Sequence, residues 1–299
     1  MRLTIETRTK INAWLRVLPK EKGATLHGLE SLFLPIALGD RLIVDTSLSE
    51  TPGFRLSSNR PDLVLGNTVQ QAWNAFVDSC PPARGRPSFQ IAVHLDKRIP
   101  EQTGLGAGSG DAGTMLLLLN QLHGFPFNRG QLHAIACQIG SDVAFFVESG
   151  PCIVRGTGDQ VEPLPPFPHL TCCIALPGFC VDTRNAYGLL DSAMADNGAS
   201  AVDPSVSLDV VLEAIQKLES LPGSGASRLN SFEATLGDNT ASFLNIRSML
   251  LASGAVLAGL SGSGSAVFGL YAERAAASAA ALEVQRRVSA VRTLVAEIL

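Results

Sequence analysis

A run of glycines at positions 104, 106, 108 and 110 is the feature that most limits how this chain can fold. Alternating apolar residues over 89–95 predict a strand before the run, and 111–124 has the pattern of a helix that Gly124 ends. Glycine permits backbone angles that other residues avoid, so successive N–H groups can turn toward one anion, and the helix adds its positive end. The order strand, glycine loop, helix therefore predicts a phosphate-binding cradle, with Ser109 as a further donor.

Other glycine-rich arrangements fit this loop less well. No Lys follows the glycines, so the Walker pattern is absent. GxGxxG occurs over 108–113, but a dinucleotide site also needs an acid about 20 residues on, and 125–136 contains none. A glycine turn that only packs closely is the remaining alternative. A second glycine turn, 259–265, predicts a flexible hairpin by itself, and the two turns together favour a polyphosphate ligand.

The chain divides into two parts of mixed α+β class. The proline-rich segment 161–170 is the expected linker, which gives domains of residues 1–162 and 163–299. Period-2 and period-3.6 patterns distinguish the elements, and the serine- and alanine-rich stretch 192–207 is expected to be a mobile loop. The expected strands are 11–17, 42–46, 89–95, 171–175, 256–258, 266–271 and 291–299, and the expected helices are 62–80, 111–124, 129–139, 183–195, 205–219, 239–252 and 273–287.

Charge and composition exclude several classes of function. The 23 Lys+Arg against 27 Asp+Glu give a net charge of -4, which argues against a non-specific nucleic-acid binder. Since no run of about 18 apolar residues exists, we expect no membrane span. The six cysteines form no CxxC pair, and they are interpreted as reduced thiols of a cytoplasmic protein. No carboxylate cluster typical of a dedicated metal site is visible.

Three segments resemble motifs of one kinase superfamily. Residues 100–109, read as Pro-x-x-x-Gly-Leu-Gly-Ala-Gly-Ser, are similar to the phosphate-binding motif of the GHMP kinases. Lys10-Ile11-Asn12 resembles the K-x-N motif of the superfamily's isoprenoid branch, and 259–266 resembles its C-terminal glycine motif. The segments 97–100 and 140–143, Lys-Arg-Ile-Pro and Gly-Ser-Asp-Val, extend the similarity to the branch that serves non-mevalonate isoprenoid biosynthesis.

The resemblance implies a fold and an activity. The fold would be an N-terminal ribosomal-protein-S5-like domain followed by a C-terminal ferredoxin-like α/β domain. The activity would be transfer of the γ-phosphoryl group of ATP, with Mg²⁺, to the 2-hydroxyl of a cytidine diphosphate-linked polyol. The enzyme would act as a monomer or homodimer on small molecules, with neither nucleic acid nor membrane as a partner.

The resemblance also assigns roles to single residues. Asp142 would be the catalytic base and Lys10 its charged partner. ATP would be bound by Lys97, Pro100, Gly104, Leu105, Gly106, Ala107, Gly108, Ser109 and Gly110, and the acceptor substrate by Asn12, His27, Thr183 and Tyr187.

The chain departs from the family pattern at three places, one of which is Asp62-Leu63-Val64, where the family has N-L-[IV] near the adenine. The family has D-G-Y-H where this chain has Ala24-Thr25-Leu26-His27, so an aliphatic side chain replaces a ring expected to stack on cytosine. Glu101 adds a negative charge beside the phosphate loop. Two alternatives follow: a kinase of the same superfamily that acts on another small alcohol, or a nucleotide-binding protein that has lost activity.

Overall fold

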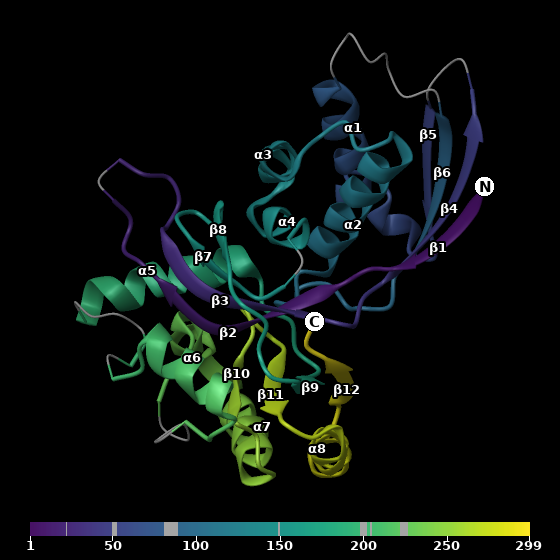
Figure 1. Ribbon diagram of the computed structural model, residues 1–299. Helices are drawn as coiled ribbons and strands as arrows, with labels where there is room; N and C mark the ends of the chain where they lie inside the picture. Colours follow the sequence, from purple (N-terminus) through teal and green to yellow (C-terminus); the bar gives the residue numbers. More distant parts are fainter. Residues whose placement is uncertain are drawn as a thin grey trace. The chain divides into compact units, whose positions relative to one another are not determined.

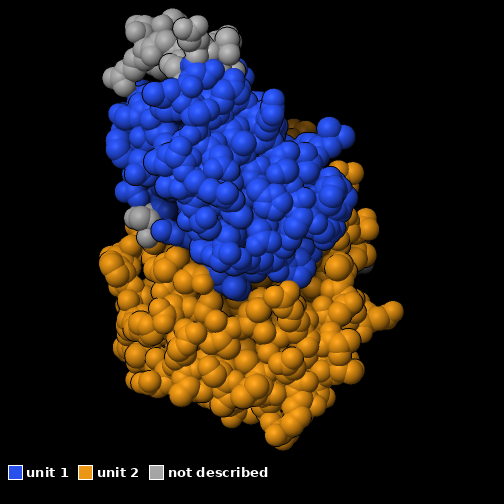
Figure 2. Space-filling model, turned by 90° about the vertical axis from the view of Figure 1, so that its right-hand side faces the viewer, with its two compact units in different colours: residues 1–9, 38–101, 106–149 blue, residues 10–37, 102–105, 150–299 orange. Residues whose placement is uncertain are grey.

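The chain folds into two compact units, and each is discontinuous in sequence (Figure 1). The computed structural model describes residues 1–21, 23–49, 53–80, 89–148, 150–197, 202–203, 205–221 and 227–299. Unit 1 comprises residues 1–9, 38–101 and 106–149, and unit 2 comprises 10–37, 102–105 and 150–299, as coloured in Figure 2. The domain boundary expected between residues 162 and 163 is a single continuous division, and it stays a prediction.

Unit 1 is a four-stranded sheet with helices on one side (Figure 1). The strand order is β1-β4-β6-β5, antiparallel except that β5 runs parallel to β6. The alternation in the sequence places Leu42, Val44, Ile91, Val93 and Leu95 in the core, as expected. The strands are β1 (Arg2–Glu6), β4 (Arg41–Leu48), β5 (Gly53–Ser58) and β6 (Phe89–Asp96), and the helices are α1 (Thr68–Ser79), α2 (Ala107–Leu122), α3 (Arg129–Ile139) and α4 (Ser141–Phe146).

Two helix starts in unit 1 differ from the expectation. The helix expected from residue 62 is wrong at its beginning: 61–63 form a short 3₁₀ turn, Gly66 has a positive φ of 73°, and α1 starts only after Asn67. The Asn67 side chain accepts a hydrogen bond from the Val69 N–H and so caps α1. In contrast, α2 begins at residue 107 rather than 111, so the second half of the glycine run is the first turn of the helix.

Unit 2 contains two four-stranded sheets, with orders β2-β3-β7-β8 and β10-β11-β9-β12. The segment expected to be a linker, 161–170, is wrong at its start, because 160–163 form strand β8, which pairs antiparallel with β7. The strands are β2 (Thr9–Val17), β3 (Leu29–Ile36), β7 (Cys152–Arg155), β8 (Gln160–Pro163), β9 (Thr171–Leu176), β10 (Leu257–Leu260), β11 (Val267–Tyr271) and β12 (Arg292–Glu297).

The helices of unit 2 are α5 (Thr183–Asn197), α6 (Leu208–Lys217), α7 (Thr240–Ala252) and α8 (Arg274–Arg287), with short 3₁₀ turns at Ser231–Thr235 and Gly237–Asn239. Of these, α7 and α8 pack on the second sheet, and α5 packs on the first 3₁₀ turn, around a core that includes Phe232, Phe243 and Tyr271. The loop expected over 192–207 is wrong for 192–197, which continue α5; residues 198–201 and 204 lie outside the described residues.

These elements confirm a mixed α+β class. All six cysteines are free thiols, as the lack of a CxxC pair indicated. Within the described ranges, no helix is both long and apolar enough to cross a membrane.

Candidate active site

The first glycine loop needs glycine at 104 and 106 for different reasons. Both residues have positive φ, 75° and 67°, a region that favours glycine. A Cβ on Gly104 would also lie 2.0 Å from the carbonyl oxygen of Ser261, so only glycine allows these two segments of unit 2 to approach. Gly106 stands at the N-cap of α2 and turns the chain into the helix. The loop conformation is therefore set by the glycines that the sequence places there.

The first turn of α2, in unit 1, forms an open cradle. The N–H groups of Ala107, Gly108 and Ser109 precede the first bond inside the helix, which joins the Gly110 N–H to the Gly106 carbonyl at 2.9 Å. A Cβ on Gly110 would lie 1.9 Å from a backbone oxygen, so packing requires that glycine. A Cβ on Gly108 would meet only Thr68 Oγ1, at 3.6 Å. Packing therefore does not require glycine at position 108, and the binding of ATP phosphates at this turn stays a prediction.

Asp142 lies in the first turn of α4, half-buried, and α4 packs directly against α2. A Cβ on Gly113 of α2 would lie 2.4 Å from the Cβ of Phe146, so this glycine allows α4 to approach closely. In the sequence, Gly113 was considered only as the last glycine of the GxGxxG pattern and not as a packing residue. Through this contact the helix that carries the expected base and the helix that begins with the cradle form one packed pair inside unit 1.

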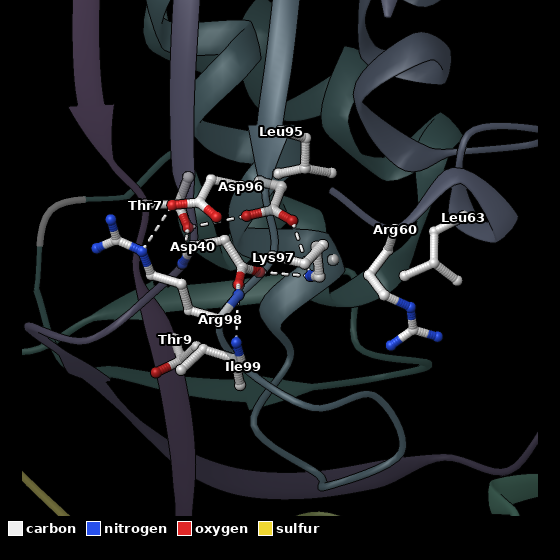
Figure 3. A network of polar contacts seen from close by, with 12 residues as sticks. Thr7, Thr9, Asp40, Arg60, Leu63, Leu95, Asp96, Lys97, Arg98 and Ile99 are labelled. Atoms are coloured by element: carbon white, nitrogen blue, oxygen red, sulfur yellow. Dashed lines mark hydrogen bonds and ion pairs between the residues drawn. The ribbon is translucent and has the colours of Figure 1, made fainter. Parts of the chain in front are cut away.

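Lys97 belongs to a buried network of charges beside the cradle helix (Figure 3). Its ammonium group contacts a carboxylate oxygen of Asp40 and lies 3.1 Å from Oδ2 of Asp111. The other Asp40 oxygen accepts hydrogen bonds from the N–H groups of Arg98, at 2.6 Å, and Ile99, at 2.9 Å. The structure thus gives Lys97 two carboxylate partners of its own, and its contact with ATP stays a prediction. Pro100, the next expected ATP residue, is exposed.

Burial shifts the titration of this network. It raises the pKa of Asp111 to about 7, with a partial offset from the nearby charge of Lys97 and a further rise from Asp40. Burial also disfavours the charge of Lys97, but the two carboxylates outweigh that effect and raise the pKa of Lys97. Thr7 Oγ1 donates a hydrogen bond of 2.8 Å to Asp111. The network ties the start of α2 to the strands of unit 1.

Lys10 and Asn12, both expected in the site, meet the glycine loop in unit 2. Lys10 is 3% exposed, and its ammonium donates to Asn12 Oδ1 at 2.5 Å and to the Gly104 carbonyl at 3.1 Å. The Lys10 N–H donates to the carbonyl of Leu105 at 2.9 Å. The Asn12 amide donates to Ser31 Oγ at 3.0 Å. A buried cation is therefore held against the loop by groups that leave its position little freedom.

The second glycine turn, 259–265, joins β10 to β11 as expected and contacts the same group. Ser261 Oγ donates to the Gly104 carbonyl at 2.9 Å and accepts from the Asn12 N–H at 3.3 Å. Thr183 Oγ1, at the start of α5, lies 2.8 Å from Ser263 Oγ. The turn thus connects two residues that were expected to bind substrate, Asn12 and Thr183.

His27 and Tyr187 form a separate cluster in unit 2. The His27 ring stacks on Tyr187, with centroids 5.3 Å apart and planes at 22°. Nδ1 of His27 lies 2.8 Å from the Leu18 carbonyl, and Nε2 lies 2.9 Å from a carboxylate oxygen of Asp191. Both ring nitrogens therefore lie beside acceptors of the chain itself. Leu26, in place of the family's tyrosine, is 63% exposed.

Several of these contacts were missed in the sequence. Ser261 and Asp111 lie inside motifs that were examined only for their glycines. Asp40 and Asp191 carried no signal, because a single acid in a turn or on a helix does not reveal a distant partner; Lys97 is 57 positions from Asp40.

The class of protein follows from matches to known families. Residues 67–150 match the GHMP kinases N terminal domain, and residues 211–290 match the GHMP kinases C terminal domain. Both domains of the class are therefore present, in order. A solved homoserine kinase from Cytophaga hutchinsonii, with a TM-score of 0.64 and 18% identity over 99% of this chain and 95% of that one, shares the fold.

Closer relatives define the branch. A 4-diphosphocytidyl-2-C-methyl-D-erythritol kinase of Rhizobium johnstonii is 33% identical over 93% of this chain and 88% of the relative, and one of Solibacter usitatus is 33% identical over 89% and 80%. A crystal structure of 4-(cytidine 5'-diphospho)-2C-methyl-D-erythritol kinase has a TM-score of 0.79 and 28% identity, over 99% of both chains. The chain belongs to the GHMP kinases and, within them, to the 4-diphosphocytidyl-2-C-methyl-D-erythritol kinase family.

Proposed function

We propose that this chain transfers the γ-phosphoryl group of ATP to the 2-hydroxyl of 4-diphosphocytidyl-2-C-methyl-D-erythritol, a step of non-mevalonate isoprenoid biosynthesis. Similarity to kinases of that name over most of the chain supports the reaction. The observation that carries the proposal is the cradle at the start of α2, where position 108 has glycine although packing would admit a side chain.

The cradle binds the phosphates of ATP through backbone amides. Ala107, Gly108 and Ser109 offer N–H groups without a helical acceptor, and Ser109 adds a hydroxyl. In the described part of the chain, no group of three or more His, Cys, Asp and Glu side chains is placed to hold a metal ion. We therefore expect Mg²⁺, which neutralises phosphate charge, to be held mainly by the phosphates and water.

Asp142 acts as the general base and Lys10 as the fixed cation. Phosphoryl transfer depends on position and charge more than on covalent help, and a carboxylate that accepts the hydroxyl proton is worth about 10²–10⁴ in rate. The buried Lys10 ammonium, fixed by Asn12 and Gly104, neutralises negative charge without a large reorganisation. Lys10→Ala should therefore lower kcat sharply; an effect on KM alone would make Lys10 a binding residue.

The acceptor substrate contacts unit 2 through Asn12, Thr183 and the His27–Tyr187 pair. Because both nitrogens of His27 lie beside Leu18 and Asp191, the pair offers the cytosine a ring surface and an edge rather than a free imidazole nitrogen.

A coupled assay for ADP release over a panel of small alcohols tests the function. The cytidine-linked methylerythritol should be the preferred acceptor, and CDP should compete with it. The exposed Leu26 favours one second candidate, a kinase for an alcohol without a nucleoside. That candidate predicts turnover of a simple alcohol and no competition by CDP, and ATP binding without ADP release from any acceptor would indicate an inactive protein.

A further inference from the structure

The second glycine turn carries buried N–H groups without a hydrogen-bond acceptor. All of 261–265 is buried, and Gly262 and Gly264 have positive φ of 55° and 95°. Among the described residues, the amides of Gly262, Ser263 and Ser265 have no acceptor. More than nine in ten buried backbone N–H groups in proteins are paired, so three unpaired donors in one turn point to a ligand.

Three carbonyl groups of the same turn, those of 260–262, already accept hydrogen bonds. The Asn230 side chain donates to the carbonyl oxygens of Leu260, at 2.9 Å, and Gly262, at 2.8 Å. The Ser261 carbonyl accepts from the Gly264 N–H at 3.0 Å. Because the carbonyls of 260–262 are used while three amides of the turn are free, the turn can present N–H groups to an anion, as backbone anion sites do.

Asn230, which makes these contacts, is buried in the core of unit 2. It is 1% exposed, and its Oδ1 accepts a hydrogen bond of 2.9 Å from the Phe232 N–H. Both N–H groups of its side-chain amide and one acceptor site of Oδ1 are thus directed at backbone groups, two of them in the turn. Asn230 fixes the conformation of the turn and does not need to touch a ligand.

The neighbours of the turn indicate which anion it takes. Ser263 bonds Thr183, and Ser261 bonds the Asn12 N–H, so acceptor-binding residues flank the turn on both sides. Tyr187 stands one turn after Thr183 on α5. These contacts connect the turn to the residues for the cytidine-linked polyol, whose anionic part is a diphosphate.

We propose that the amides of Gly262, Ser263 and Ser265 bind the diphosphate group of the acceptor substrate, and that Asn230 is the positioning residue that presents them. The anion site follows from the turn itself; its assignment to the acceptor rests on the proposed function.

A titration followed by amide NMR tests the site in the intact wild-type chain. Inorganic pyrophosphate and CDP should shift the amide signals of Gly262, Ser263 and Ser265, and ADP should shift them less at equal concentration. Unmoved signals with pyrophosphate and CDP would mean that water alone occupies the turn and would overturn the proposal. A stronger response to ADP would assign the turn to ATP and overturn it equally.

The variant Asn230→Asp tests the positioning role. The substituted side chain keeps an oxygen that accepts from the Phe232 N–H, but it places a carboxylate oxygen against the carbonyls of Leu260 and Gly262. The affinity for CDP should therefore fall about tenfold or more. The KM for the acceptor should rise, and the KM for ATP should not change. Asn120→Asp is the matched control, since Asn120 is a buried amide of unit 1 whose side chain, in the part of the chain that the structure describes, bonds the backbone of Phe127, and it should leave CDP affinity unchanged.

Two outcomes overturn the positioning role: unchanged CDP affinity in Asn230→Asp, or an equal loss in both variants. If Asn230→Asp does not fold, Asn230→Ser provides the same comparison with a smaller side chain. Failure of the proposed function is a separate result, because the amide shifts with pyrophosphate would remain while no acceptor is phosphorylated.

Discussion

We propose that both glycine turns bind an anion through the backbone, and the structure gives each turn its free N–H groups in a different way. The first, 104–110, runs into α2, is partly exposed and gains its donors from the unpaired end of a helix. The second, 259–265, joins two antiparallel strands and is buried; within the described residues three of its amides lack an acceptor, while Asn230 and the turn itself occupy the carbonyls of 260–262. The comparison teaches that unpaired backbone N–H groups arise both at the start of a helix and in a turn whose conformation a buried side chain fixes.

The largest effect is expected for Asp142, the proposed general base, whose helix α4 packs against the helix of the first glycine loop. Asp142→Asn removes the proton acceptor, so kcat should fall about 10²–10⁴-fold while ATP affinity and the melting temperature change little. Single-turnover kinetics with saturating ATP measures the loss. Asp209→Asn, which alters an exposed first-turn acid of α6, is the control and should retain full activity. Near-wild-type turnover of Asp142→Asn would contradict the role of the base.

The next largest effect is a loss of folding stability in Gly104→Ala, which tests the packing role of the first loop separately from its proposed binding role. Gly104→Ala places a Cβ 2.0 Å from the Ser261 carbonyl in a residue with φ of 75°. Strain and overpacking together should lower the free energy of unfolding by about 2–5 kcal/mol. Chemical denaturation measures this loss, and a loss below ~1 kcal/mol would show that the loop can move away from the second turn.

Gly108→Ala should weaken ATP binding without lowering the stability of the fold. The new methyl group meets only Thr68 Oγ1, at 3.6 Å, and alanine favours the helix, so stability should be equal or higher. The same methyl enters the phosphate cradle, so the KM for ATP should rise about tenfold, equivalent to ~1.4 kcal/mol. Equal KM values for ATP in the variant and the wild type would place the phosphates elsewhere.

A smaller effect is expected in the pH dependence of the free energy of unfolding, through Asp111, the buried acid that follows the first glycine loop. The folded-state pKa of Asp111, about 7, lies above the unfolded value, so the folded state binds more protons between about pH 4 and pH 7. Stability contributed by this group therefore falls as pH rises through that window, by at most ~1.4 kcal/mol per pH unit. Asp111→Asn should flatten the dependence in denaturation curves across the window. An unchanged slope would mean that Asp111 is ionised throughout.

The smallest effect is expected at the surface ion pair beside His27 in unit 2. Lys20 and Asp191 form an ion pair of 2.8 Å with both side chains about two-fifths exposed, 39% and 43%. Such surface pairs are worth about 0–1 kcal/mol, so Lys20→Ala should change the unfolding free energy by less than ~1 kcal/mol. A larger loss in thermal unfolding would show that the pair holds the His27–Tyr187 cluster in place.

The fold was predictable where its patterns are local. Alternation predicted the half-buried strands β4 and β6, and the helix patterns predicted α3, α7 and α8. Strand β3 was missed, because six of its eight residues are buried and give no alternation. The start of α1 was misplaced although Gly66 and the capping Asn67 were visible, because the apolar pattern was extended across them.

The site was predictable where a motif carries it and not where distant segments meet. The glycines and the Lys10–Asn12 pair were found from short motifs, and the structure brings Lys10, Asn12 and Gly104 together. The partners of Lys97 were not predictable, and neither was Asn230, since its bonds reach 30 and 32 positions along the chain. Such contacts depend on the tertiary fold, which no local pattern encodes.

The most direct test of the account is ³¹P NMR of a reaction containing the chain, Mg-ATP and the cytidine-linked methylerythritol. The account predicts a new phosphomonoester signal that grows in step with ADP, while the diphosphate signals of the acceptor persist. ADP formed without a new ester, or no change in the ATP signals, would contradict it.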